Sequence, residues 1–292
     1  MLLLERLLSL IRMSSKKRFC TPYPPSPPVE NWRIFKLNDV SLYVNNPTAV
    51  DDVITYCKGN GFNWIQFYGL YSVFGTGLEA DLALMIEAAY ATGTILRVGA
   101  IMGAGTAGFS AALNYNSTVL PNQQFNDMNK ENEFWRYPSD PAAESSASWL
   151  ASMVWLRAQI NGLSYPCVNS AYIQDYVPSV WPAGVTLQMI QAEIDYLETT
   201  NYTTTPDELA VRNSLLSQLG NAAISNNTIQ KFNNLFSAEA GFMGPYFGTN
   251  GLAASFGSWT SQYAADSFSG KNGLLNTGVN VFSYNDLSAY IP

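Results

Sequence analysis

The sequence predicts an α/β protein whose strands and helices close into a (β/α)8 TIM barrel, with room for irregularity in the second half. From residue 30 onward, apolar segments with strand character alternate with amphipathic helical segments, a pattern typical of a parallel sheet covered by helices. About seven such units over about 260 residues fit a barrel, which typically needs ~250 residues. With 47% hydrophobic residues, the chain can fill a core of that size. An open, doubly wound sheet is the alternative fold.

The first half is predicted to supply strand segments separated by two helices. The first helix begins at Asn46-Pro47, because Asn is a favoured N-cap and Pro fits the first helical turn. It ends at Gly59 and Gly61, and the second helix ends at Gly93. The predicted strand segments are residues 32–39, 41–44, 63–71 and 94–102. The apolar faces of the two helices are Val50, Val53, Ile54 and Cys57, and Leu78, Leu82, Met85, Ile86 and Ala89.

The second half predicts a fourth strand over residues 125–133, followed by less regular spacing. Residues 186–200 fit a helix, although Ile190 to Leu197 also fits a strand, so the strand count there stays open. The run Thr205-Pro206-Asp207-Glu208 predicts a helix start, with Thr205 as the cap and a glutamate in the capping-box position. The remaining predicted elements are a helix carrying Trp149, Met153, Leu156 and Ile160, and strands at residues 170–177, 234–244 and 278–284.

The N-terminal region differs from the rest of the chain, so we divide the sequence into a tail at residues 1–29 and a barrel domain at residues 30–292. The apolar stretch at the start is interrupted by Glu5 and Arg6, and its positive charges follow it, which is the reverse of a secretory signal. It is also too short to span a membrane. We expect a proline-rich linker here and no transmembrane segment, and the localisation, cytoplasmic or secreted by a route not evident, stays open.

Composition excludes several classes of function. The chain has no histidine, so catalytic triads based on Ser-His or Cys-His are impossible. Its three cysteines, Cys20, Cys57 and Cys167, are too far apart in sequence for ordinary zinc-ligand spacing. A net charge of −7 argues against a nucleic-acid partner, because phosphate binding needs a basic surface. Any catalysis must therefore depend on carboxylates, tyrosines or a cofactor.

Acidic side chains are concentrated in the predicted fourth strand, in the stretch FNDMNKENEFW. A period of two places Asn129, Glu131 and Glu133 on one face. In a barrel that face points inward, and active sites form at the C-terminal ends of the strands. Two neighbouring carboxylates repel each other, so that one tends to keep its proton, as a general acid must. The other interpretation is a solvated turn.

This stretch resembles the fourth-strand signature D-x-x-D-x-D-x-E of family-18 glycoside hydrolases, the chitinases and endo-β-N-acetylglucosaminidases. The aligned positions are Asn126, Asn129, Glu131 and Glu133, so only Glu133 matches outright. Two further segments agree in chain order. Residues 96–100 lie where the family has an S-x-G-G strand, with Arg97 in place of the serine, and residues 278–286 resemble its last strand, with Phe282 in place of a tryptophan.

The resemblance implies substrate-assisted retaining hydrolysis of glycans that contain N-acetylglucosamine. Glu133 would protonate the glycosidic oxygen, and the acetamido oxygen of the sugar would attack the anomeric carbon. Glu131 would orient the acetamide in place of the family's aspartate. Tyr172 or Asp175 would supply the tyrosine or acid that the family carries on a later strand.

Other residues are candidates for contacts with a sugar. Glu239 follows a predicted strand and would reach a site at the top of a barrel, although a salt-bridged or capping acid is an equal alternative. Aromatic rings stack on the C–H faces of sugars, but most aromatic residues in such a chain belong to the core. The candidate platforms are Trp135, Trp181, Tyr246, Phe247 and Phe282.

Three functions are consistent with these patterns. The first is the glycoside hydrolase, with a glycan substrate and no cofactor. The second is a catalytically inactive barrel that binds carbohydrate or a protein partner, which the substitutions at Arg97, Asn129, Glu131 and Phe282 favour. The third is a nucleotide-dependent oxidoreductase, based on the G-x-G-x-x-G match at Gly103 to Gly108, where a flexible loop over the barrel mouth is the alternative.

Overall fold

The computed structural model describes residues 31–291, except 138, 141 and 175–186, and shows a closed barrel of parallel strands in the order β1 to β8. The predicted (β/α)8 fold is therefore confirmed. The open-sheet alternative is wrong, because β1 pairs with both β2 and β8. The strands are β1 (Trp32–Leu37), β2 (Trp64–Phe67), β3 (Arg97–Met102), β4 (Asp127–Lys130), β5 (Val168–Ile173), β6 (Tyr196–Asn201), β7 (Gln230–Ser237) and β8 (Leu274–Phe282).

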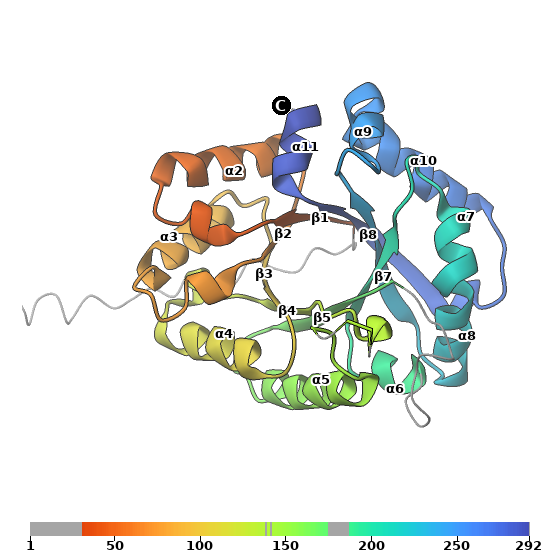
Figure 1. The fold of residues 1–292 in the computed structure, drawn as a ribbon, viewed down its shortest axis with the longest axis horizontal. Helices are drawn as coiled ribbons and strands as arrows, with labels where there is room; N and C mark the ends of the chain where they lie inside the picture. Colours follow the sequence, from red (N-terminus) through yellow and green to blue (C-terminus); the bar gives the residue numbers. More distant parts are fainter. Residues whose placement is uncertain (1–30, 138, 141, 175–186, 292) are drawn as a thin grey trace, which may run out of the picture.

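Helices surround the barrel on all sides (Figure 1). The longer ones are α2 (Pro47–Gly59), α3 (Glu79–Ala91), α4 (Ala107–Thr118), α5 (Ser146–Asn161), α8 (Ser217–Ser225) and α10 (Leu252–Ala265). The shorter ones are α6 (Leu187–Gln191), α7 (Glu208–Val211), α9 (Gly244–Asn250) and α11 (Tyr284–Tyr290). Single 3-10 turns are η1 (Val40–Leu42), η2 (Leu70–Ser72), η3 (Pro121–Gln123), η4 (Phe134–Arg136) and η6 (Lys271–Gly273). The π-helical segment η5 (Arg212–Leu216) connects α7 directly to α8. No helix in the described part of the chain is long and apolar enough to cross a membrane.

The first two helices begin and end close to where the sequence predicts. Asn46 is the N-cap of α2, and its side chain accepts the Ala49 N–H at 3.3 Å. The predicted apolar face of α2 is buried against the barrel. The predicted strand at residues 41–44 is wrong, because the Asp39 side chain accepts the Ser41 N–H at 3.3 Å and turns the chain into η1.

The second half departs further from the predictions. Residues 186–200 contain the short helix α6 and then most of strand β6, so neither a single helix nor a strand at 190–197 is correct. The cap of α7 is Asp207 and not Thr205, because the Asp207 carboxylate accepts the Ala210 N–H at 3.3 Å. Strand β4 ends at Lys130, earlier than the predicted strand at 125–133.

The barrel closes where β8 meets β1, and this closure depends on Gly278. In the β1–β8 register Gly278 lies opposite Trp32. A Cβ atom on Gly278 would lie 1.8 Å from the Trp32 carbonyl oxygen, and the backbone at Gly278 has φ +151°. Only glycine fits that conformation without displacing the neighbouring strand.

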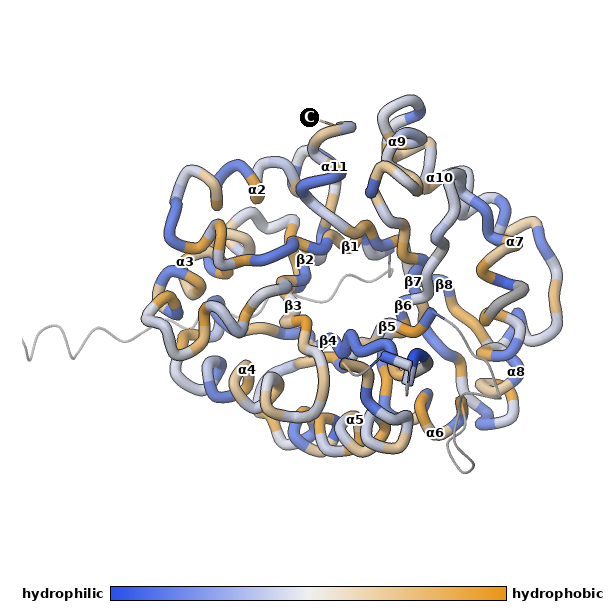
Figure 2. Tube along the Cα trace, in the orientation of Figure 1, coloured by the Kyte–Doolittle hydropathy of each residue, from blue (hydrophilic) through white to orange (hydrophobic). Residues whose placement is uncertain are grey.

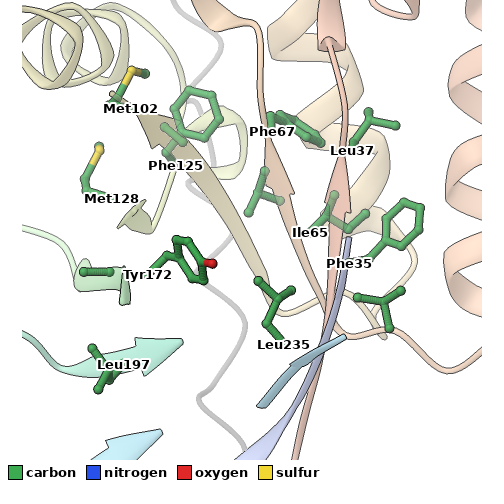
Figure 3. Close-up of a cluster of buried hydrophobic side chains, with 14 of the residues drawn as sticks. Phe35, Leu37, Ile65, Phe67, Met102, Phe125, Met128, Tyr172, Leu197 and Leu235 are labelled. Atoms are coloured by element: carbon green, nitrogen blue, oxygen red, sulfur yellow. The ribbon is translucent and has the colours of Figure 1, made fainter. Parts of the chain in front are cut away.

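Apolar side chains pack in two places. The larger cluster fills the layer between the strands and the helices, and Figure 3 shows part of it, with Phe35 and Leu37 of β1 near Ile65 and Phe67 of β2. The helices accordingly carry both hydrophobic and hydrophilic residues (Figure 2). A smaller cluster lies at the N-terminal ends of the strands and consists of Trp32, Ile34, Trp64 and Tyr196. The interior nearer the other end of the barrel is polar.

Candidate active site

Alternate residues of several strands place buried polar side chains inside the barrel. Lys36 of β1, Asn129 of β4 and Glu198 of β6 are all fully buried. They come from different strands and meet because alternate side chains of every strand in a barrel point inward. Their level lies toward the C-terminal ends of the strands, the end at which active sites of such barrels form.

Lys36 is bound by two carboxylates. Its Nζ lies 3.1 Å from Glu131 Oε2 and 2.7 Å from Glu198 Oε2. Burial lowers the pKa of Lys36, but the two carboxylates outweigh burial, and the pKa of Lys36 lies above its ordinary value. The side chain is therefore an ammonium ion, and it is not available as an amine nucleophile at neutral pH.

Glu198 is in turn held by two amides. Its Oε1 accepts hydrogen bonds from Gln66 Nε2 at 2.7 Å and Asn129 Nδ2 at 3.0 Å. Asn129 Nδ2 also donates to Ser170 Oγ at 2.8 Å. These contacts fix the position of Glu198 beneath the ammonium group of Lys36.

Asp127 lies deeper, on the same face of β4 as Asn129. Its carboxylate accepts hydrogen bonds from Trp64 Nε1 at 3.1 Å, Gln66 Nε2 at 3.0 Å and Ser170 Oγ at 2.6 Å. Burial, together with the negative charge of Glu198, raises the pKa of Asp127 to about 7. The sequence prediction missed Asp127 because the alignment with the family motif selected Asn126. The strand period of two, which places Asn129 inside the barrel, places Asp127 there as well.

Glu131 follows the last residue of β4 and lies at the mouth of the barrel. Its side chain is 25% exposed, although Lys36 and the Tyr68 hydroxyl both contact it. Burial and the carboxylate of Glu131 raise the pKa of Tyr68, so this hydroxyl donates its proton. The rings of Phe282 and Tyr68 pack edge-on, with their centroids 5.7 Å apart. Because Tyr68 contacts Glu131, the end of β8 lies close to Glu131.

Glu133 lies beyond the strand, in the turn before η4. Its Oε2 is 2.6 Å from Arg136 Nη1, and Arg136 also contacts Asp140 at 3.3 Å. The Glu133 side chain is 29% exposed. Asn129 and Glu131 therefore belong to one network through Glu198 and Lys36, whereas the contacts of Glu133 are made within its own loop. The expectation that all three lie on one face of a continuous strand is wrong, because β4 ends at Lys130.

The remaining predicted residues are dispersed. Tyr172 of β5 is buried, its hydroxyl is 3.5 Å from that of Tyr202, and Lys36 Nζ lies 5.7 Å from its ring centroid. Glu239 follows β7 and accepts the Ser237 hydroxyl at 2.6 Å. Trp135 belongs to η4, directly after the Glu133 loop.

Asp175 and Trp181 lie outside the described residues. Phe247 is fully buried against Phe236 and Phe256, so its prediction as a sugar platform is wrong, because it is part of the core. Tyr246 is partly buried against the same core.

The glycine-rich segment at residues 103–108 is bound to a carboxylate of the protein itself. Gly105 N–H donates to Glu144 Oε1 at 2.7 Å, and Lys130 Nζ lies 2.6 Å from Glu144 Oε2. The helix that follows is α4. Because Glu144 already uses the amide and the cation that a phosphate group would need, this loop does not support nucleotide binding. Among the described residues, no cluster of three or more His, Cys, Asp or Glu side chains is placed to hold a metal ion.

Comparison with known proteins gives similarity in fold only. No family model matches the chain, and no curated protein matches it. A family-18 chitinase from Cycas revoluta in complex with (GlcNAc)3 is 12% identical with a TM-score of 0.49, over 89% of this chain and 97% of that chain. The family-18 chitinase ChiB from Flavobacterium johnsoniae is 8% identical with a TM-score of 0.48, over 88% of this chain and 89% of that chain. A 2,3-dimethylmalate lyase is 11% identical with a TM-score of 0.39, over 87% of this chain and 76% of that chain. These similarities concern the barrel fold alone and do not identify a reaction for this chain.

Proposed function

We propose that the chain is a glycoside hydrolase that acts on glycans containing N-acetylglucosamine. The observation that carries this proposal is the position of Glu131 at the C-terminal mouth of the barrel. Its carboxylate is bound from inside by Lys36 and Tyr68, and its side chain is still 25% exposed. A fixed, partly open carboxylate at this end of a barrel suits contact with a polar substrate.

In the proposed reaction, Glu131 orients the substrate and Glu133 supplies the proton. A carboxylate bound to an ammonium ion is a hydrogen-bond acceptor, so Glu131 would accept the N–H of the substrate's acetamido group. The acetamido oxygen then attacks the anomeric carbon, while Glu133 protonates the departing glycosidic oxygen. Glu133 must first leave Arg136, which lies 2.6 Å away in the free protein.

Other predicted residues would support the site from inside the barrel or offer a surface to the sugar. Asn129 supports the network beneath Glu131, and Tyr172 lies beside Lys36. Phe282 lies against Tyr68 and offers an aromatic surface at the end of β8. Roles for Trp135, Asp175 and Glu239 in substrate binding stay predictions.

One observation favours a second candidate, a barrel that binds carbohydrate without cleaving it. In the free protein both acidic candidates are already in ion pairs, Glu131 with Lys36 and Glu133 with Arg136. Carboxylates bound in this way accept hydrogen bonds from sugar hydroxyl groups without transferring a proton. Such a protein would bind the same oligomers and release no product.

The two candidates are separated by measuring release of a chromophore from N-acetylglucosamine oligomer glycosides. For a hydrolase, Glu133→Gln should lower kcat by roughly 10²- to 10⁴-fold, the usual contribution of a general acid. Asp51→Asn, which removes an exposed charge from helix α2, serves as the control and should behave like wild type. Saturable binding without product release in the wild type would favour the binding protein, and neither binding nor release would reject both.

A further inference from the structure

We infer that Lys36 and Glu198 act as a positioning pair that holds the Glu131 carboxylate in the mouth of the barrel. The inference rests on the proposed function for its catalytic meaning, but its geometry does not involve the substrate. Neither residue is itself exposed at the mouth, because both side chains are fully buried. Both would therefore act through Glu131.

The contacts form a chain from the barrel interior to its opening. Gln66 and Asn129 donate to Glu198 Oε1, and the other carboxylate oxygen lies 2.7 Å from Lys36 Nζ. The same ammonium group lies 3.1 Å from Glu131 Oε2. Since Glu198 is held from two further strands, it fixes Lys36, and Lys36 fixes Glu131.

A structural role alone does not readily explain a lysine at this position. Barrel interiors are normally filled by branched apolar side chains, and burying an ion pair is often no more stabilising than an apolar replacement of similar volume. The chain also contains a second fully buried lysine, Lys130, which is paired with Glu144 on the outer side of β4. That lysine anchors a loop, whereas Lys36 contacts a residue at the mouth.

The first test measures how freely the Glu131 carboxylate reacts, without any sugar. Carboxylates are labelled with a carbodiimide and glycinamide, and mass spectrometry compares Glu131 with Glu133 in the same peptide. The two side chains are almost equally exposed, at 25% and 29%, so Glu133 is an internal reference. In the wild type, Glu131 should label roughly tenfold more slowly, because its partner Lys36 is fully buried, whereas Arg136, the partner of Glu133, is itself exposed and holds its carboxylate less firmly.

The decisive variant is Lys36→Met with Glu198→Gln, which removes both buried charges together and keeps the Oε1 acceptor for Gln66 and Asn129. The labelling ratio of Glu131 to Glu133 should rise to near one. Lys130→Met with Glu144→Gln removes the other buried lysine–glutamate pair and should leave the ratio as in wild type. If the double variant does not fold, Glu198→Gln alone takes its place. This variant retains Lys36 and its contact with Glu131, so it should give an intermediate labelling ratio.

The second readout is kinetic. If the wild type cleaves N-acetylglucosamine glycosides, misplacing Glu131 in the double variant should lower kcat by about 10²-fold and change KM much less. A labelling ratio that is near one in wild type, or that does not respond to the double variant, would overturn the inference. A ratio that responds as expected in a protein that neither binds nor cleaves glycans would reject the proposed function and keep the positioning pair.

Discussion

Asp127 is the residue whose ionisation the fold alters most clearly near neutral pH. It is fully buried, and its oxygens accept hydrogen bonds from Trp64, Gln66 and Ser170. Burial raises the pKa of Asp127 from 3.8 to about 7, and the nearby charge of Glu198 adds to the effect. The folded protein therefore keeps a proton at pH values at which the unfolded chain has lost it.

The sign of the pH dependence follows from this difference. Between about pH 4 and pH 7 the native state binds one more proton than the unfolded state, so the contribution of Asp127 to stability falls as pH rises, by about 1.4 kcal/mol per pH unit. Asp127→Asn removes this slope and resembles the protonated form. The unfolding free energies of wild type and Asp127→Asn are measured by urea denaturation at several pH values. As pH rises, the unfolding free energy of the variant should increase relative to that of wild type. Parallel curves for the two proteins would contradict the prediction.

The residues of the site were only partly predictable from sequence. Periodicity along β4 selected Asn129 and Glu131, because alternate residues of one strand share a face. Lys36 and Glu198 were not predicted, because their side chains, from β1 and β6, meet only inside the closed barrel. The residue pattern of one strand does not reveal which residues lie across the barrel from it. The local ion pair of Glu133 with Arg136 was equally hidden, because it forms in the turn that ends the strand early.

At the level of elements, the loop after β3 is tied to β4 and to the loop before α5. Lys130 Nζ donates to Ser152 Oγ at 2.7 Å and lies 2.6 Å from Glu144, which accepts the Gly105 N–H. Burial lowers the pKa of Lys130, while Glu144 opposes this change. One buried cation thus connects three segments.

Lys130→Met should loosen this connection. Removing one partner of a buried ion pair leaves the other without compensation, so the unfolding free energy should fall by roughly 3 kcal/mol. The Gly105 amide should also exchange its hydrogen faster, since Glu144 loses the cation that holds it. Lys58→Met, at an exposed position in the last turn of α2, should change stability by no more than about 0.5 kcal/mol. Unchanged exchange at Gly105 would show that the loop is held by other contacts.

The junction of β8 and β1 is a second element-level constraint. Gly278→Ala would place a methyl group against the Trp32 backbone, with the nearest atom at 1.8 Å, and should destabilise the protein by about 3 kcal/mol. Gly257→Ala in α10 is a matched control, because a Cβ atom added there would have no other atom within 4 Å, and it should stabilise the helix by about 0.5–1 kcal/mol. Thermal unfolding of both variants tests the pair, and similar melting temperatures would contradict the prediction.

Elements with strong local signals were predicted well, and those without them were not. Helix α2 has an N-cap, a proline and a clear apolar face, so its start was correct. Strand β6 was obscured because the segment before it, Leu187–Gln191, continues the same apolar spacing as a short helix. Where a helix and a strand share one apolar run, the boundary between them depends on pairing with the neighbouring strands. Here β6 pairs with β5 and β7.

Across the whole molecule, the two ends of the barrel interior have different chemistry. At the N-terminal end, the Arg97 guanidinium lies 4.3 Å from the ring of Trp32, 4.8 Å from that of Trp64 and 4.7 Å from that of Tyr196. These rings come from β1, β2 and β6, so one cation on β3 joins strands around the barrel. The other end carries the network of Lys36 and Glu131. Arg97, which the sequence alignment placed at the position of a serine of family-18 hydrolases, therefore lies at the N-terminal end of the barrel, away from Glu131.

This separation predicts that the two ends respond differently to substitution. Arg97→Met should lower the unfolding free energy by about 2 kcal/mol, because contacts between a desolvated cation and aromatic rings are lost. Its affinity for N-acetylglucosamine oligomers should stay within about twofold of wild type, as expected for a substitution distant from the site. Glu131→Gln leaves Glu198 as the counter-ion of Lys36, so it should cost only on the order of 1 kcal/mol while weakening substrate orientation. Urea denaturation and calorimetric titration of wild type, Arg97→Met and Glu131→Gln make the comparison. An Arg97→Met variant that loses glycan affinity while still folded would show that the two ends of the barrel are coupled.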